Sequence, residues 1–165
     1  MNKRKGFIIL AILMLMSVFI FRLYSENNLL KNRQGEIIQR NILRVQIDIS
    51  CAQEDLGDND VSISNLYRDH WKFNEYSMFD LPQRGIPGYL MNIRNDFDEL
   101  IKLRENKLSQ QEVDVVKIRL QSQLSKLQEA LSLINKECGN ESINYYLLNS
   151  NDNKTMQNVI NILIE

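Results

Sequence analysis

Three oxygen-bearing side chains, Asp58, Asp60 and Ser62, stand at alternate positions, which is the spacing that opens an EF-hand calcium loop. Such a loop also needs a glycine at its sixth position, where the chain turns sharply, and a glutamate at its last. In this chain those two positions hold Ile63 and Asp69. The sequence therefore predicts a solvated loop here and no metal site.

Side chains suited to acid–base or nucleophilic catalysis are sparse. His70 is the only histidine, whereas activated serine or cysteine nucleophiles usually need a histidine base. No nucleophile elbow, phosphate-binding loop or dinucleotide-binding motif is present. Asp96, Asp98 and Glu99 cluster, but on a helix only the first and third share a face, as is typical of a solvated surface. We expect no enzymatic activity and no cofactor; an enzyme with an unrecognised site stays as an alternative.

The two cysteines, Cys51 and Cys138, form an even set. Outside the cytoplasm an even count favours a disulfide bond. We predict that these two residues are bridged if the chain is exported. The alternative is a pair of free, buried thiols.

Aromatic side chains are dense between positions 67 and 79. Such rings are favoured at the centres of protein interfaces. This segment is therefore our candidate interaction surface, although the same rings could instead cap a helical core. The residues in question are Tyr67, Trp71, Phe73, Tyr76 and Phe79.

The longest apolar run, Phe7–Phe21, is interrupted only by Ser17 and carries no charge. A bilayer core needs about 20 helical residues, and Tyr24 with the stem of Arg22 extends the run toward that length. The basic residues at positions 3–5 orient such a span with its N-terminus in the cytoplasm.

Two other interpretations of this run remain open. The stretch Arg22–Glu26 is a poor match to the small residues of a signal-peptidase site, which disfavours cleavage. A buried helix of a soluble protein is the third possibility. We predict a cytoplasmic tip at 1–5, a membrane-spanning anchor at 6–24 and an exported domain at 25–165, which places the protein in the cytoplasmic membrane.

The charge balance argues against nucleic acid as a partner. Residues 1–24 carry four of the 20 lysines and arginines and none of the 21 acids, so the remainder has a formal charge of −5. Nucleic-acid binding needs clustered cations.

Hydrophobic periodicity predicts an all-α domain. A helix is expected over 27–56, ending at Gly57, because apolar residues follow steps of three and four. The same pattern predicts helices over 89–108, 110–138 and 155–164. The first seam consists of Ile38, Ile42, Val45, Ile49, Ala52 and Leu56, and the clearest one of Leu120, Leu124, Leu127, Leu131, Ile134 and Cys138.

Segment 57–88 is expected to be largely irregular, because glycines and both prolines punctuate it. A short helix near Ser64–Tyr76 is compatible with it. Further on, Ser109 and Glu112 have the spacing of a capping box, so we expect the chain to break near 106–109. One unbroken helix over 89–138 is the alternative.

These elements predict an up-down-up helical bundle, coiled-coil-like in its packing, with Cys51 and Cys138 together at the end far from the membrane. We expect a non-enzymatic, anchored protein whose exported domain binds another envelope protein, as a scaffold, exclusion or toxin-neutralising factor, or associates with itself through the heptad helices. In outline, a basic tip, an anchor and an exported helical domain also resemble the inner-membrane subunit of a phage spanin, which implies a role in host lysis.

Overall fold

The computed structural model describes residues 3–58, 61–78, 81–82, 85–150 and 153–164, with side chains from Leu10 onward except at position 11. All regular structure in these residues is helical, which confirms the predicted all-α class. The helices are α1 (Lys3–Gly57), α2 (Ile63–Tyr76), α3 (Ile86–Glu105), α4 (Gln110–Cys138), α5 (Ser142–Leu147) and α6 (Lys154–Ile164).

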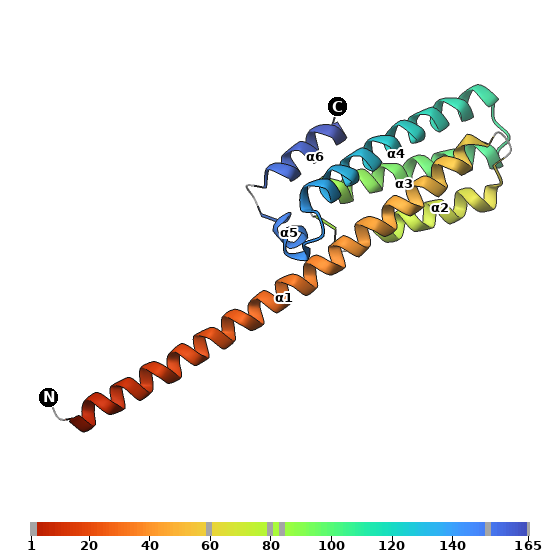
Figure 1. The fold of residues 1–165 in the computed structure, drawn as a ribbon. Helices are drawn as coiled ribbons and strands as arrows, with labels where there is room; N and C mark the ends of the chain where they lie inside the picture. The colour runs from red at the N-terminus through yellow and green to blue at the C-terminus, as the bar shows by residue number, and fades with distance from the viewer. Residues whose placement is uncertain (1–2, 59–60, 79–80, 83–84, 151–152, 165) are drawn as a thin grey trace.

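The second half of α1 packs with α2, α3 and α4 in a four-helix bundle (Figure 1). Each of these helices runs antiparallel to the next, and α4 closes the ring by lying against α1. This is the up-down-up-down arrangement that short connections favour. We call the end of the bundle beside the free part of α1 its base, and the opposite end its tip.

The core of the bundle is built from the two heptad seams predicted from the sequence. All six seam residues of α1 are at most 4% exposed, and those of the α4 seam at most 5%. The seams are therefore covered within one chain. Aromatic rings fill the centre, where Phe73 of α2 stacks on Phe97 of α3 with centroids 5.6 Å apart.

Side-chain caps set where the bundle helices begin. The hydroxyl of Ser62 accepts a hydrogen bond from the Asn65 amide at the start of α2. Before α4, Ser109 and Glu112 form the reciprocal bonds of a capping box, and Lys107 turns the chain with a φ of 51°. The chain thus breaks between α3 and α4 where the sequence predicted it.

The prediction that segment 57–88 is largely irregular is wrong, because α2 fills the place of the short helix considered near Ser64–Tyr76 and α3 already begins at Ile86. Pro87 sits in the first turn of α3, where a missing amide hydrogen costs no hydrogen bond. The glycines and prolines therefore mark the ends of helices. The additional helix also reverses the direction predicted for every later element: α3 runs toward the tip, and α4 returns to the base.

Helices α5 and α6 close the base of the bundle. The short α5 packs along α1, and α6 lies on α4 and touches α3. The contact of α5 with α1 is made at Gly35, which is buried against the backbone of Ser142. Lys31 adds a cation–π contact, with its ammonium 5.9 Å from the centre of the Tyr146 ring.

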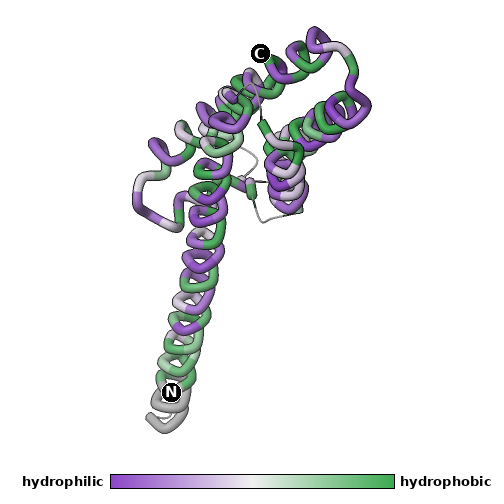
Figure 2. The backbone as a smooth tube through the Cα atoms, turned by 90° about the vertical axis from the view of Figure 1, so that its right-hand side faces the viewer, coloured by the Kyte–Doolittle hydropathy of each residue, from purple (hydrophilic) through white to green (hydrophobic). Residues whose placement is uncertain are grey.

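The first half of α1 stands clear of the bundle as a free stalk (Figures 1 and 2). Every described side chain of residues 10–24 is exposed, and most are apolar. Asn28 is the first described residue along the helix that is partly buried. Among the described residues, no helix meets the length and hydropathy criteria for a membrane span.

Candidate binding surface

Helix α2 carries the predicted aromatic residues and divides them between two faces. Its inner face packs into the core through Phe73 and Tyr76, which are both fully buried. On its outer face Trp71 is 67% exposed and Tyr67 is 42% exposed. Phe79 lies outside the described residues. The segment is thus neither wholly a cap on the core nor wholly a surface.

The two faces follow from helical geometry. Trp71 follows Tyr67 by four residues, so both project from one side of α2. Met78 is 79% exposed just beyond the end of α2. Sequence reasoning missed Met78, because it lies after the last turn of α2.

Trp71 and Met78 line an open groove of about 560 Å³ on the outer side of α2. The polar residues that complete its walls are Arg68, Lys72, Asn74 and Glu75. We refer to these six residues together as the Trp71 groove.

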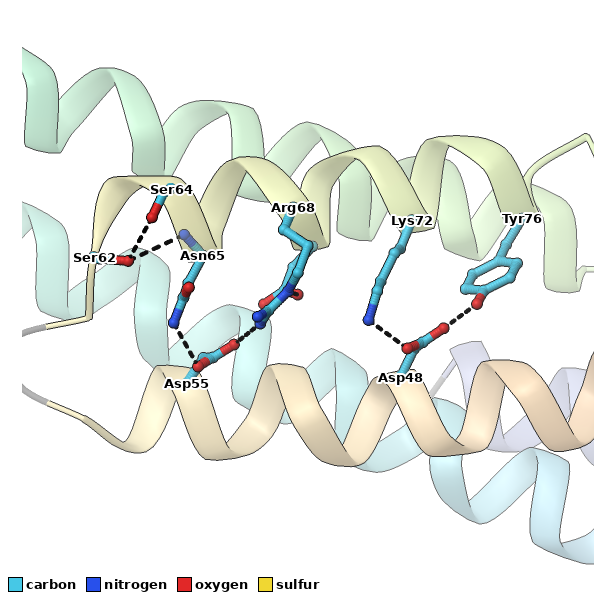
Figure 3. A network of polar contacts seen from close by, with 9 residues as sticks. Asp48, Asp55, Ser62, Ser64, Asn65, Arg68, Lys72 and Tyr76 are labelled. Atoms are coloured by element: carbon cyan, nitrogen blue, oxygen red, sulfur yellow. Dashed lines mark hydrogen bonds and ion pairs between the residues drawn. The ribbon is translucent and has the colours of Figure 1, made fainter.

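Ion pairs with α1 hold the charged walls of the groove (Figure 3). Lys72 donates to Asp48 at 2.5 Å, and the Tyr76 hydroxyl donates to the other oxygen of that carboxylate. One turn toward the tip, Arg68 donates to Asp55, which also accepts from Asn65 at 3.0 Å.

The remaining polar walls of the groove are also engaged within the protein. Glu75 pairs with Arg44 at 3.8 Å, and the side-chain oxygen of Asn74 accepts from Arg94 at 3.2 Å. Because its charged groups already have partners of opposite charge, the groove does not need an ionic ligand. Its exposed apolar side chains favour a ligand that is apolar where it makes contact.

Asp69 is one of the buried residues of α2 and is only 1% exposed. One carboxylate oxygen accepts from Nε of Arg68 at 3.1 Å, whereas Oδ2 is buried without a hydrogen-bond partner. Burial raises the pKa of Asp69 to about 6, although the charge of Arg68 acts in the opposite direction. Asp69 is therefore a titratable group inside the α1–α2 contact.

The predicted disulfide between Cys51 and Cys138 is absent, since both thiols are free. Hydrogen bonds from Gln53 to Ser125 and from Gln46 to Ser132 set α1 antiparallel to α4. In this register Cys51 is level with position 127, about 16 Å along the axis from Cys138. A bridge needs Cα atoms within about 7 Å.

The prediction failed because α2 is a full bundle helix. The chain crosses the bundle once more than expected, so Cys138 ends at the base, whereas Cys51 lies nearer the tip. Cys51 faces solvent and Cys138 is 5% exposed. Burial raises the pKa of the Cys138 thiol to about 11, which suppresses its reactive thiolate.

The residues considered for calcium binding have other roles. Ser62 caps α2, and the backbone carbonyl of Asp58 accepts from the Lys117 ammonium at 3.0 Å. Asp60 lies outside the described residues. Within the part of the chain that the structure describes, no three side chains of histidine, cysteine, aspartate or glutamate form a group able to hold a metal ion.

The other candidate catalytic residues lie on the surface of α3 or against it. Asp96 and Glu99 both pair with Arg119 of α4, so they join the two helices. Asp98 pairs with Lys102 on its own helix at 2.6 Å. His70 is half-buried, and desolvation lowers its pKa. Each carboxylate therefore has a structural ion pair.

No family model, characterised protein or solved structure matches this chain.

Proposed function

We propose that this protein is a non-enzymatic, single-pass membrane protein whose exported helical bundle binds another protein through the Trp71 groove. The observation that carries the proposal is the exposure of Trp71, at 67%, on a helix that buries Phe73 and Tyr76 completely. An exposed tryptophan beside a methionine is typical of an anchor residue at a protein interface. The ion pairs between α2 and α1 hold the helix that carries it.

The stalk of α1 supports the membrane part of the proposal. Its apolar side chains point in every direction around the helix, which is the pattern of a segment surrounded by lipid or protein. The apolar run begins at Phe7, before the first described side chain. The hydroxyl of Ser17 bonds the Met14 carbonyl at 2.8 Å, so it needs no partner outside the helix.

Charges bracket this apolar segment in a way that suits a membrane. Arg22 pairs with Glu26 at 3.0 Å, which neutralises the first charge that follows the run. The basic residues at positions 3–5 favour an N-terminus that stays in the cytoplasm, with the bundle outside it. We therefore propose the cytoplasmic membrane as the location and an envelope protein as the partner of the Trp71 groove.

Trp71→Ala tests the binding proposal, and Ile118→Ala provides a matched control. Ile118 is equally exposed, at 66%, but lies on α4 outside the groove. The full chain is crosslinked in its native membrane and its partner is identified by mass spectrometry. We expect Trp71→Ala to lose the partner and Ile118→Ala to retain it. Equal capture by both variants would contradict the proposal.

The anchor is tested separately by carbonate extraction and by a reporter fused after the C-terminus. We expect full-length protein to remain in the membrane fraction, and the reporter to work only if its activity requires export. A shorter, soluble product would show that the apolar segment is a cleaved signal.

A further inference from the structure

We infer that the base of the bundle, formed by α5 and the adjoining turn of α1, rests on the lipid headgroup layer. This inference depends on the proposed membrane anchor and adds a second, peripheral contact with the same bilayer. Its partner is the lipid surface itself.

Helix α5 lies at a small height above the proposed membrane. Ser142 lies against Gly35 and Tyr146 against Lys31, so α5 descends α1 toward the stalk. Leu147 is consequently level with about position 30, roughly six residues or 10 Å beyond Tyr24. Headgroups occupy about 5–8 Å on each side of the hydrocarbon core, and a leucine side chain together with a modest tilt of α1 closes the difference.

The base of the bundle exposes apolar and amphipathic side chains. Leu29, Leu30 and Leu147 are 52%, 59% and 47% exposed at the base of the bundle. Tyr146, half-buried against Lys31, adds an amphipathic ring, the kind of side chain that is enriched at the membrane interface. On α1 the polar residues at positions 25–28 separate this patch from the apolar stalk.

The base also carries positive charge. Lys31 and the exposed Arg33 bring two cations to the same level of α1. Cations close to a bilayer surface are attracted to lipid phosphates, and the attraction is stronger when the lipids are anionic. Leucines flanked by tyrosine, lysine and arginine have the composition of an interfacial segment.

Contact at the base would hold the bundle at a fixed height and rotation. Lys72, next to Trp71, pairs with Asp48, which lies about 36 Å beyond Tyr24 along α1. A bundle seated on α5 therefore presents the Trp71 groove well above the lipid and on one defined side of the anchor.

The test uses the full chain in phosphatidylcholine and phosphatidylglycerol vesicles that contain lipids with a nitroxide on the headgroup. The natural Trp71 is replaced by phenylalanine, and a single reporter is introduced by Leu147→Trp. The control is Ile118→Trp in the same background, because Ile118 lies near the tip. Circular dichroism checks that both variants fold, and both reporters replace exposed side chains.

We expect the tryptophan at position 147 to lose most of its emission to the nitroxide and the one at position 118 to keep it. Equal, weak quenching of both in protein that floats with the vesicles would overturn the inference while leaving the anchor intact. Protein that fails to float would overturn the anchor, and with it this inference.

Discussion

The carbonyl oxygen of Ser142 lies where a side chain on Gly35 would begin: a Cβ atom at position 35 would be 1.7 Å from it. From the sequence, this glycine is a weak point of a long helix, costing about 1 kcal/mol relative to alanine. The structure explains why position 35 holds a glycine: α5 approaches the backbone of α1 there too closely for any side chain to fit.

Gly35→Ala should therefore lower the free energy of unfolding, by about 1–3 kcal/mol, as overpacking usually does. The direction of this change in the free energy of unfolding is informative, since the same substitution would stabilise an isolated helix. Gly88→Ala in α3 is the control, because a Cβ there meets nothing within 4 Å. Urea unfolding measures both variants. A Gly35→Ala variant as stable as the parent chain would mean that α5 does not pack on α1 in this way.

Trp71→Ala and Phe73→Ala should separate the two faces of α2. Phe73 is fully buried and stacks on Phe97, so its removal should cost about 3–5 kcal/mol. Trp71 is largely exposed, and its removal should change the free energy of unfolding by less than about 1 kcal/mol. Thermal and urea unfolding of the two variants give the comparison. A large loss for Trp71→Ala would assign that ring to the core.

Asp69 should make stability depend on pH. Its pKa is about 6 in the folded chain and 3.8 as its ordinary value, so the folded state binds the proton more tightly. The resulting stability is fully present below the ordinary pKa and is lost as pH rises through about 6. The difference amounts to about 2–3 kcal/mol at most.

Asp69→Asn should flatten this part of the curve of unfolding free energy against pH between about 4 and 7. Asp98→Asn is the control, because the hydrogen bond from Lys102 lowers the pKa of Asp98. Asp98 therefore stabilises the fold at neutral pH and loses this effect on acidification, which is the opposite of Asp69. Denaturant titrations at several pH values measure both. An Asp69→Asn curve parallel to that of the parent chain would show that Asp69 titrates normally.

The parts of the fold that the sequence predicted well are the helices whose apolar residues repeat regularly over many turns. The seams of α1 and α4 identify the buried faces of both helices, and the capping box at Ser109 identifies the turn before α4. Such local signals do not depend on distant contacts. Helix α2 was expected only as a short helix near Ser64–Tyr76 within an irregular segment. Its place as a full helix of the bundle was not predicted, because its charged residues, such as Arg68 and Lys72, are paired with acids on another helix.

The candidate site was predictable only as a region. Sequence composition identified the aromatic segment, but burial of Phe73 and exposure of Trp71 depend on which face of α2 meets the bundle. Met78 joins the groove through its place after the last turn of α2. The error in the direction of α4 had a larger effect, because one additional crossing moved Cys138 from the tip to the base.

The two thiols should consequently differ in reactivity. Cys51 is exposed, so a maleimide should label it completely in the native protein. Cys138 is buried, and its pKa of about 11 leaves almost no thiolate at neutral pH, so it should react only after unfolding. Peptide mass spectrometry after labelling with and without urea locates both modifications. Cys51→Ser should leave an unlabelled native protein, whereas Cys138→Ser should leave native labelling unchanged. A linked peptide joining Cys51 to Cys138 within one chain, found under non-reducing conditions, would require α4 to run toward the tip and would contradict the four-helix order.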